Sequence, residues 1–173
     1  MENQIPTAKF SINYGIILGL ILILIHVLMY VSGMLLEGKQ WPMYLYYAIF
    51  PAFVIFAISA YKKKNSGFLT LGQALKTGIS IAALSGLVYA IYNGIFNFFI
   101  EPDFIDQMME VTREKMMENP NMTEEQIEMS IKFAKKLGGP IIGSAFFILL
   151  SVFFGFIYSL IGGLIMRKKQ DLY

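Results

Sequence analysis

The stretch LKTGISIAALSGLVYAIYNGIFNFFI, residues 75–100, decides the fold of this 173-residue chain. It exceeds the roughly 20 apolar residues that a helix needs to cross a hydrocarbon core of about 30 Å. Lys76, near its start, can extend its amine toward the membrane surface. Small residues recur at every fourth position, which places them near one face of a helix. They are Gly78, Ala82, Gly86, Ala90 and Gly94. The stretch therefore predicts a transmembrane helix that packs closely against another helix.

Three further apolar runs lie at about residues 14–36, 42–61 and 140–166. The composition agrees, with 56% hydrophobic and 15% charged residues and a mean hydropathy of +0.58. For the first run, a cleavable signal peptide is the alternative, but its apolar region would span only about 7–15 residues. We therefore expect an all-α fold, an integral membrane four-helix bundle that forms a single domain over residues 1–173.

The absence of certain residue types narrows the chemistry. The chain contains no cysteine and a single histidine, which excludes disulfides, cysteine-ligated metals and multi-histidine metal sites. We expect neither a metal nor a cofactor. The basic residues form short clusters beside the apolar runs, a pattern typical of membrane flanks rather than of nucleic-acid binding. The lipid bilayer is thus the expected surrounding, and no nucleic-acid partner is expected.

The basic clusters also predict the direction of the spans. Both lie on one side of the membrane if there are four spans, and the positive-inside rule makes that side cytoplasmic. Both termini are then cytoplasmic, and residues 101–139, with nine acidic and five basic residues, are extracytoplasmic. The clusters consist of Lys62, Lys63, Lys64 and Lys76 around the second loop and Arg167, Lys168 and Lys169 after the fourth run.

Residues 101–139 have the pattern of a helical hairpin between the third and fourth spans. The first helix should end near Glu118, because the residue before Pro120 is biased away from helical geometry. Thr123 with Gln126 three positions later is a capping box that starts the second helix. We expect the hairpin to have one apolar face. That face would pack on the membrane surface or the bundle, with partner docking as the alternative.

Four methionines between Met108 and Met117 raise the question of copper(I), which thioethers bind. No histidine or cysteine accompanies them, and methionine is common throughout the chain. We therefore interpret these side chains as packing residues.

A second row of small residues predicts which helix meets the third span. The row lies on the fourth run, and we expect the third span to be the packing centre and to meet the fourth closely. Homodimerisation through the same face is the alternative. The row consists of Ser151, Gly155, Ser159 and Gly163, and the first run carries the single pair Gly15 and Gly19.

Four polar or ionisable side chains within the predicted spans are the candidates for a ligand site or a path: His26, Tyr89, Asn93 and Asn97. Polar groups in hydrocarbon need partners, so these should face the bundle or water. Interhelical hydrogen bonding is the simpler interpretation. No aspartate or glutamate lies within a span to relay a proton from His26, which argues against proton-coupled transport.

Residues along the whole chain carry a resemblance to a known family. They are Tyr14, Gly15, Phe68, Gln73, Ala74, Gly78, Tyr89, Tyr92, Glu101, Pro102, Tyr158, Ser159, Leu160 and Ile161, with the basic tail. Through them the chain resembles the bacterial four-span membrane proteins grouped as domain of unknown function 4199, found mainly in the Bacteroidetes. The resemblance implies a multi-pass protein of the bacterial cytoplasmic (inner) membrane. It supplies no catalytic residues.

The function expected from the sequence is non-enzymatic. The chain lacks a nucleophile with a matching base, a metal cluster and a glycine-rich phosphate loop. We expect it to act in the bilayer by self-association, as a homodimer, or by interaction with a membrane partner protein. The alternative is a small transporter or channel for an unknown solute, with His26, Asn93 and Asn97 lining its path.

Overall fold

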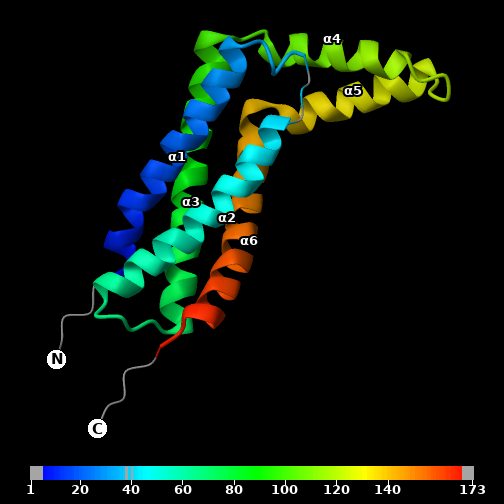
Figure 1. Cartoon of the computed structure of the whole chain (residues 1–173). Helices are drawn as coiled ribbons and strands as arrows, with labels where there is room; N and C mark the ends of the chain where they lie inside the picture. Colours follow the sequence, from blue (N-terminus) through cyan, green and yellow to red (C-terminus); the bar gives the residue numbers. More distant parts are fainter. Residues whose placement is uncertain (1–5, 38, 40, 169–173) are drawn as a thin grey trace.

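The computed structural model describes residues 6–37, 39 and 41–168, and Lys169 of the basic tail lies outside them. Within this part of the chain the regular structure is helical, apart from one isolated antiparallel bridge between Leu69 and Lys168. The elements are α1 (Thr7–Val31), α2 (Trp41–Lys64), α3 (Leu71–Ile95), the π-helical turn η1 (Phe96–Ile100), α4 (Phe104–Met117), α5 (Glu124–Gly138) and α6 (Pro140–Met166) (Figure 1).

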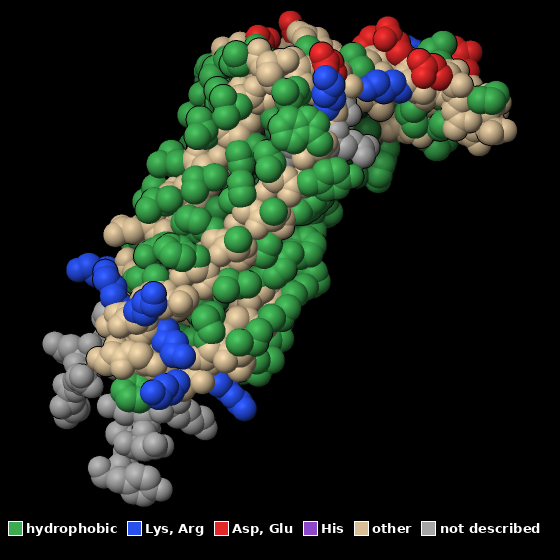
Figure 2. Space-filling model, in the orientation of Figure 1, with side chains coloured by type: hydrophobic (Ala, Val, Ile, Leu, Met, Phe, Trp, Pro, Cys, Tyr) green, Lys and Arg blue, Asp and Glu red, His purple; other side chains and the backbone are tan. Residues whose placement is uncertain are grey.

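Among the described residues, four helices are long and apolar enough to cross a membrane: α1, α2, α3 with η1, and α6. This confirms the all-α, four-span fold. Figure 1 shows these helices side by side, with α4 and α5 projecting sideways from one end of the bundle. We call α4 and α5 the arm, and the end that bears them the arm end. The opposite end is the basic end, where Lys and Arg side chains gather (Figure 2).

The helix that contains the first predicted span does not begin and end with the apolar run. α1 begins at Thr7 rather than near residue 14. Its first turns can be helical although they are polar, because the buried Ser11 hydroxyl has a partner within the helix: it donates to the Thr7 carbonyl at 2.8 Å. The helix ends at Val31 rather than near residue 36, ahead of Gly33, whose φ of +74° requires the left-handed region that glycine tolerates.

The third span begins earlier than predicted and ends in a different geometry. A capping box at Thr70 starts α3 at Leu71: the Gln73 amide donates to the Thr70 hydroxyl at 3.2 Å, and the Thr70 amide donates to the Gln73 side chain at 2.9 Å. Its last turn, Phe96–Ile100, is π-helical. By contrast, α6 covers the residues predicted for the fourth span, 140–166.

α3 lies at the centre of the bundle, where its most extensive contacts are with α6 and then with α1. The two small-residue rows meet along the antiparallel α3–α6 contact. A Cβ built on Gly78 would lie 2.4 Å from the Ser159 Cβ, and one built on Gly155 would lie 2.4 Å from the Ala82 Cβ. The helix backbones therefore approach more closely than larger side chains would permit. Farther along the same contact, Gly163 faces Ala74, and Gly86 faces Ile148 and Ser151.

The predicted row of α3 does not make this contact over its full length. A Cβ on Gly94 would find nothing within 4 Å, and Ala90 is only half-buried. The reason is the helical pitch: at 3.6 residues per turn, a four-residue row turns by about 40° per step, so Gly94 no longer lies on the face that carries Gly78. At the arm end α3 and α6 are joined by a polar contact instead, in which the Asn93 side-chain amide donates to the Ser144 hydroxyl at 3.0 Å.

The glycine pair of α1 packs against α3. A Cβ on Gly15 would lie 2.6 Å from the Leu84 Cβ, and one on Gly19 would lie 2.7 Å from the Val88 Cβ. α2 joins the bundle through buried side chains between Phe50 and Tyr61, which belong to a hydrophobic core. They are Phe50, Val54, Ala57, Ile58 and Tyr61.

The arm consists of two contacting helices. Ion pairs join Arg113 to Glu128 and Lys135 to Asp106. The capping box predicted at Thr123 is present and begins α5, while α4 ends at Met117, one residue before the predicted end.

Candidate functional site

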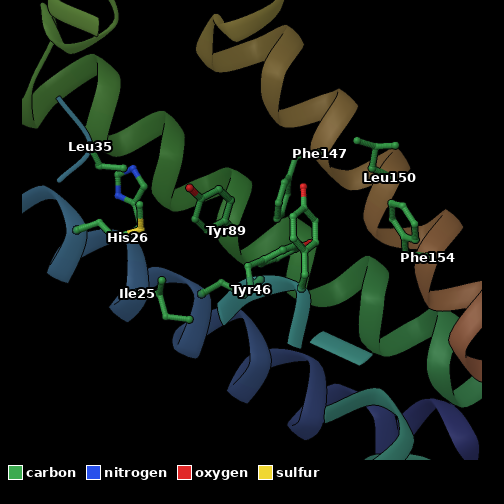
Figure 3. A pocket seen from close by; sticks show the side chains of 11 residues that line it. Ile25, His26, Leu35, Tyr46, Tyr89, Phe147, Leu150 and Phe154 are labelled. Carbon is green, nitrogen blue, oxygen red and sulfur yellow. The ribbon is translucent and has the colours of Figure 1, made fainter. Parts of the chain in front are cut away.

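A cavity of about 390 Å³ lies in the arm-end half of the bundle, between α1, α2, α3 and α6 (Figure 3). His26 and Tyr89 stand on one side of it, and Tyr46 and Phe147 on another. The remaining walls are almost wholly apolar. The lining residues are Leu22, Ile25, His26, Met29, Leu35, Tyr46, Tyr47, Tyr89, Phe147, Leu150 and Phe154.

The course of α2 leaves this space open. From Phe50 onward the helix contributes buried side chains to the core, whereas Trp41, Tyr44 and Tyr47 nearer its start are 50%, 65% and 56% exposed. The intervening wall is aromatic. The Phe147 ring lies 4.7 Å from the Tyr89 ring and 6.0 Å from the Tyr46 ring, measured between centroids. Large rings hold the helices apart at this level, so the cavity results from side-chain size.

The polar wall of the cavity belongs to the contact between α1 and α3. The His26 Nδ1 and the Tyr92 hydroxyl are hydrogen-bonded at 3.0 Å, and the His26 ring meets the Tyr89 ring edge-on at 6.0 Å. One turn along α1, the Tyr30 hydroxyl donates to Glu101. Phe96 packs against both His26 and Tyr30, with centroids 5.0 Å apart in each case. We call His26, Tyr92, Tyr30 and Glu101 the polar seam.

The π-helical turn positions the acidic member of the seam. The Glu101 amide donates to the Phe96 carbonyl at 2.8 Å, the five-residue spacing that defines a π-turn. This wider turn ends the span with Glu101 beside α1, within reach of Tyr30. Such turns are frequent at functional sites.

The structure divides the four residues singled out from the sequence into two pairs. His26 and Tyr89 line the cavity, but Asn93 and Asn97 do not. The Asn97 side-chain amide donates to the Asn93 carbonyl at 2.9 Å and to its side-chain oxygen at 3.0 Å, while Asn93 bonds to Ser144. The asparagines therefore form an interhelical hydrogen-bond cluster toward α6, and the four residues do not form a single path.

Sequence reasoning missed Tyr30, Glu101, Tyr46 and Phe147 as site residues. Tyr30 follows His26 by four positions, a spacing that places both on one helix face. That spacing was a usable signal for the polar seam. Tyr46 lies at the start of an apolar run, where an aromatic ring is typical of a headgroup anchor, and Phe147 carried no signal within an apolar run.

The polar groups at the cavity are few. They are the His26 imidazole and the hydroxyls of Tyr46, Tyr47 and Tyr89. Of these, His26 is hydrogen-bonded to Tyr92 in the polar seam. Within the described residues, no group of three or more histidine or acidic side chains could hold a metal ion. The site offers hydrogen-bonding groups on one side and a large apolar surface on the others.

Comparison with known proteins identifies the family. The profile of a family described as "Protein of unknown function (DUF4199)" matches residues 13–168. Because the match covers most of the chain, the chain belongs to this family. No curated protein and no solved structure matches it.

Proposed function

We propose that this member of the DUF4199 family is a non-enzymatic membrane protein that binds a hydrophobic or amphiphilic small molecule in the cavity between α1, α2, α3 and α6. The cavity itself supports this proposal. Its volume of about 390 Å³ lies in the range of roughly 300–1,000 Å³ typical of ligand sites. Such sites combine predominantly apolar walls with a few polar groups that fix orientation, the role we give to His26 and Tyr89.

The bilayer is the source of ligand that we propose. The basic end carries the lysine and arginine clusters, so the positive-inside rule places it, with both termini, on the cytoplasmic side. The cavity would then lie in the outer leaflet of the bacterial cytoplasmic membrane, with the arm outside. A molecule with an apolar chain can reach it laterally, past the exposed first half of α2.

Transport is the weaker candidate. The basic-end half of the bundle is filled by a core of large buried side chains, among them Phe10, Leu18, Phe50 and Tyr61. The polar groups of the seam and of the asparagine cluster all lie in the arm-end half. A continuous polar path from end to end would require this core to separate.

Self-association or a membrane partner protein is the second candidate mode of action. From Gly78 to Gly86 the small-residue row of α3 is covered by α6 within one chain, so a second copy cannot use that part of the face without displacing α6. The exposed aromatic half of α2, with Trp41, Tyr44 and Tyr47, is the face we assign to such contacts.

Native mass measurement in a mild detergent, with identification of co-purifying molecules, tests the proposal. Leu150→Trp adds bulk to the cavity wall, and Leu149→Trp is the matched control, because Leu149 is 63% exposed and does not line the cavity. We expect a bound small molecule that is lost in Leu150→Trp and retained in the control. Retention in both variants would refute binding at this site, and a co-purifying protein without a small molecule would favour the second candidate.

A further inference from the structure

α5 has two apolar sides, and only one of them is covered. Ile127 is buried on the side that faces α4. On another side, Met129, Phe133 and Leu137 are 67%, 63% and 45% exposed. Because these three lie four residues apart, they form one stripe along the helix. An exposed row of large apolar side chains marks a surface that contacts a partner or a membrane.

The stripe continues into the membrane-facing surface of the bundle. The next position at the same spacing is Ile141, 74% exposed in the first turn of α6. Between them, Gly138, Gly139 and Pro140 turn the chain from the arm into the span. Figure 1 shows α5 meeting α6 at a steep angle, so that the arm runs across the direction of the spans. The same apolar surface therefore passes from a helix that crosses the bilayer to one that lies across its end.

The acidic side chains of the arm gather on the other face. In Figure 2, hydrophobic side chains occupy the face of the arm turned toward the flank of the bundle, and acidic side chains gather on the face turned away. An exposed acidic row on α4 consists of Asp106, Glu110 and Glu114. An amphipathic helix of this kind, apolar on the membrane side and charged on the other, lies in the plane of a membrane interface.

We infer that the arm is a membrane-surface element, with the stripe Met129, Phe133 and Leu137 seated at the boundary between lipid headgroups and acyl chains. Lys132 and Lys136, adjacent to the stripe, can extend their amines toward lipid phosphates while their methylene stems contact the chains. Residues 101–139 carry nine acidic and five basic residues. The arm therefore binds the membrane through burial of its apolar side chains rather than through attraction to anionic lipid. The inference is independent of any ligand in the cavity.

Fluorescence quenching by brominated lipid tests the depth of the stripe. The only tryptophan is Trp41, so Trp41→Phe gives a silent background for single tryptophans at three positions. Phe133→Trp reports on the stripe, Glu110→Trp on the acidic row, and Phe153→Trp on the middle of α6. The full-length variants are reconstituted into phosphatidylcholine–phosphatidylglycerol vesicles whose acyl chains carry bromine either near the headgroup or near the chain end.

We expect position 133 to be quenched more strongly by the shallow bromines than by the deep ones, position 153 to show the reverse, and position 110 to be quenched by neither. Quenching at 133 should not change when the salt concentration is raised. Absence of quenching at position 133 would overturn the inference, because the stripe would then be exposed to water or covered by protein rather than by lipid.

Cysteine chemistry gives a second measurement, because the chain has no native cysteine. In vesicles, Phe133→Cys should react more slowly with a water-soluble maleimide than Glu110→Cys does. Equal rates would contradict membrane seating. Efficient oxidative crosslinking between copies through position 133 would also contradict it, since it would show that a second copy covers the stripe.

Discussion

Substitution of Gly78 by alanine is the sharpest test of the α3–α6 contact. The added Cβ would lie 2.4 Å from the Ser159 Cβ, 3.0 Å from the Ser159 Oγ and 3.2 Å from the Val54 Cγ1. The nearest atom is the first carbon of a side chain, fixed to the α6 backbone, and it cannot swing away as the end of a long side chain could. The two helices must therefore move apart, or the backbone must shift.

The expected cost follows from this geometry. Forcing an extra carbon into a well-packed contact destabilises a protein by about 1–3 kcal/mol. Gly94 provides a matched control on the same helix and in the same four-residue row, because a Cβ there would find nothing within 4 Å. Alanine in a helix is favoured over glycine by up to about 1 kcal/mol, so Gly94→Ala should be neutral or slightly stabilising. Because both variants gain the same helix propensity, their free energies of unfolding should differ by the overpacking cost, about 1–3 kcal/mol.

Reversible unfolding in mixed detergent micelles, followed by circular dichroism, measures this difference. The clash involves the Ser159 Cβ rather than its hydroxyl, so a second substitution discriminates between causes. Ser159→Gly should restore most of the stability lost in Gly78→Ala, whereas Ser159→Ala, which keeps the Cβ, should not. Equal stabilities of Gly78→Ala and Gly94→Ala, or rescue by Ser159→Ala as effective as that by Ser159→Gly, would refute the close-contact reasoning.

Three further experiments test other contacts. In a double-mutant cycle, His26→Phe and Tyr92→Phe should show a coupling of about 0.6 kcal/mol, the average for hydrogen bonds between membrane helices; additive effects would contradict the 3.0 Å bond. Thr123→Ala removes the cap of α5 and should destabilise that helix by about 1 kcal/mol, seen as faster amide exchange in its first turn but unchanged exchange in α6. Lys115→Met removes the 2.7 Å hydrogen bond from Nζ to the Glu37 carbonyl; because both residues are exposed, it should change global stability by at most about 1 kcal/mol while speeding amide exchange around residue 37.

The number of spans and the central helix could be predicted because each depends on local sequence. Length and hydropathy define a span, and a four-residue repeat of small side chains defines a close contact whatever the partner. The ends of the first helix were harder to predict. The polar start of α1 is accommodated by tertiary contacts, since the Ser11 hydroxyl also lies 3.3 Å from the Thr77 carbonyl of α3. Hydropathy measured along one segment cannot register that contact.

The polar seam shows a second limit. A search for a carboxylate within the spans finds no partner near His26, because Glu101 lies just beyond the apolar run. The π-helical turn and the bond from Tyr30 bring that carboxylate to the end of α1 nonetheless. A single wider turn alters which residue faces the neighbouring helix. Phe96–Ile100 contains no proline or glycine from which this turn could be predicted.

The position of the cavity follows from how the four spans divide the small residues. α3 approaches α6 through glycine, alanine and serine, and the glycines of α1 admit Leu84 and Val88 of α3. α2 has no glycine, and its first half presents large rings instead, including Tyr46 and Tyr47. Helices in a membrane approach closely where side chains are small. α2 therefore contributes to the core from Phe50 onward, with Val54, Ala57 and Ile58, and stands off where Tyr46 and Tyr47 lie. The site therefore lies beside the aromatic half of the one span without glycine. A search of the sequence for polar residues within the spans finds only the side of the cavity that His26 and Tyr89 line. The cavity itself results from the size of apolar and aromatic side chains.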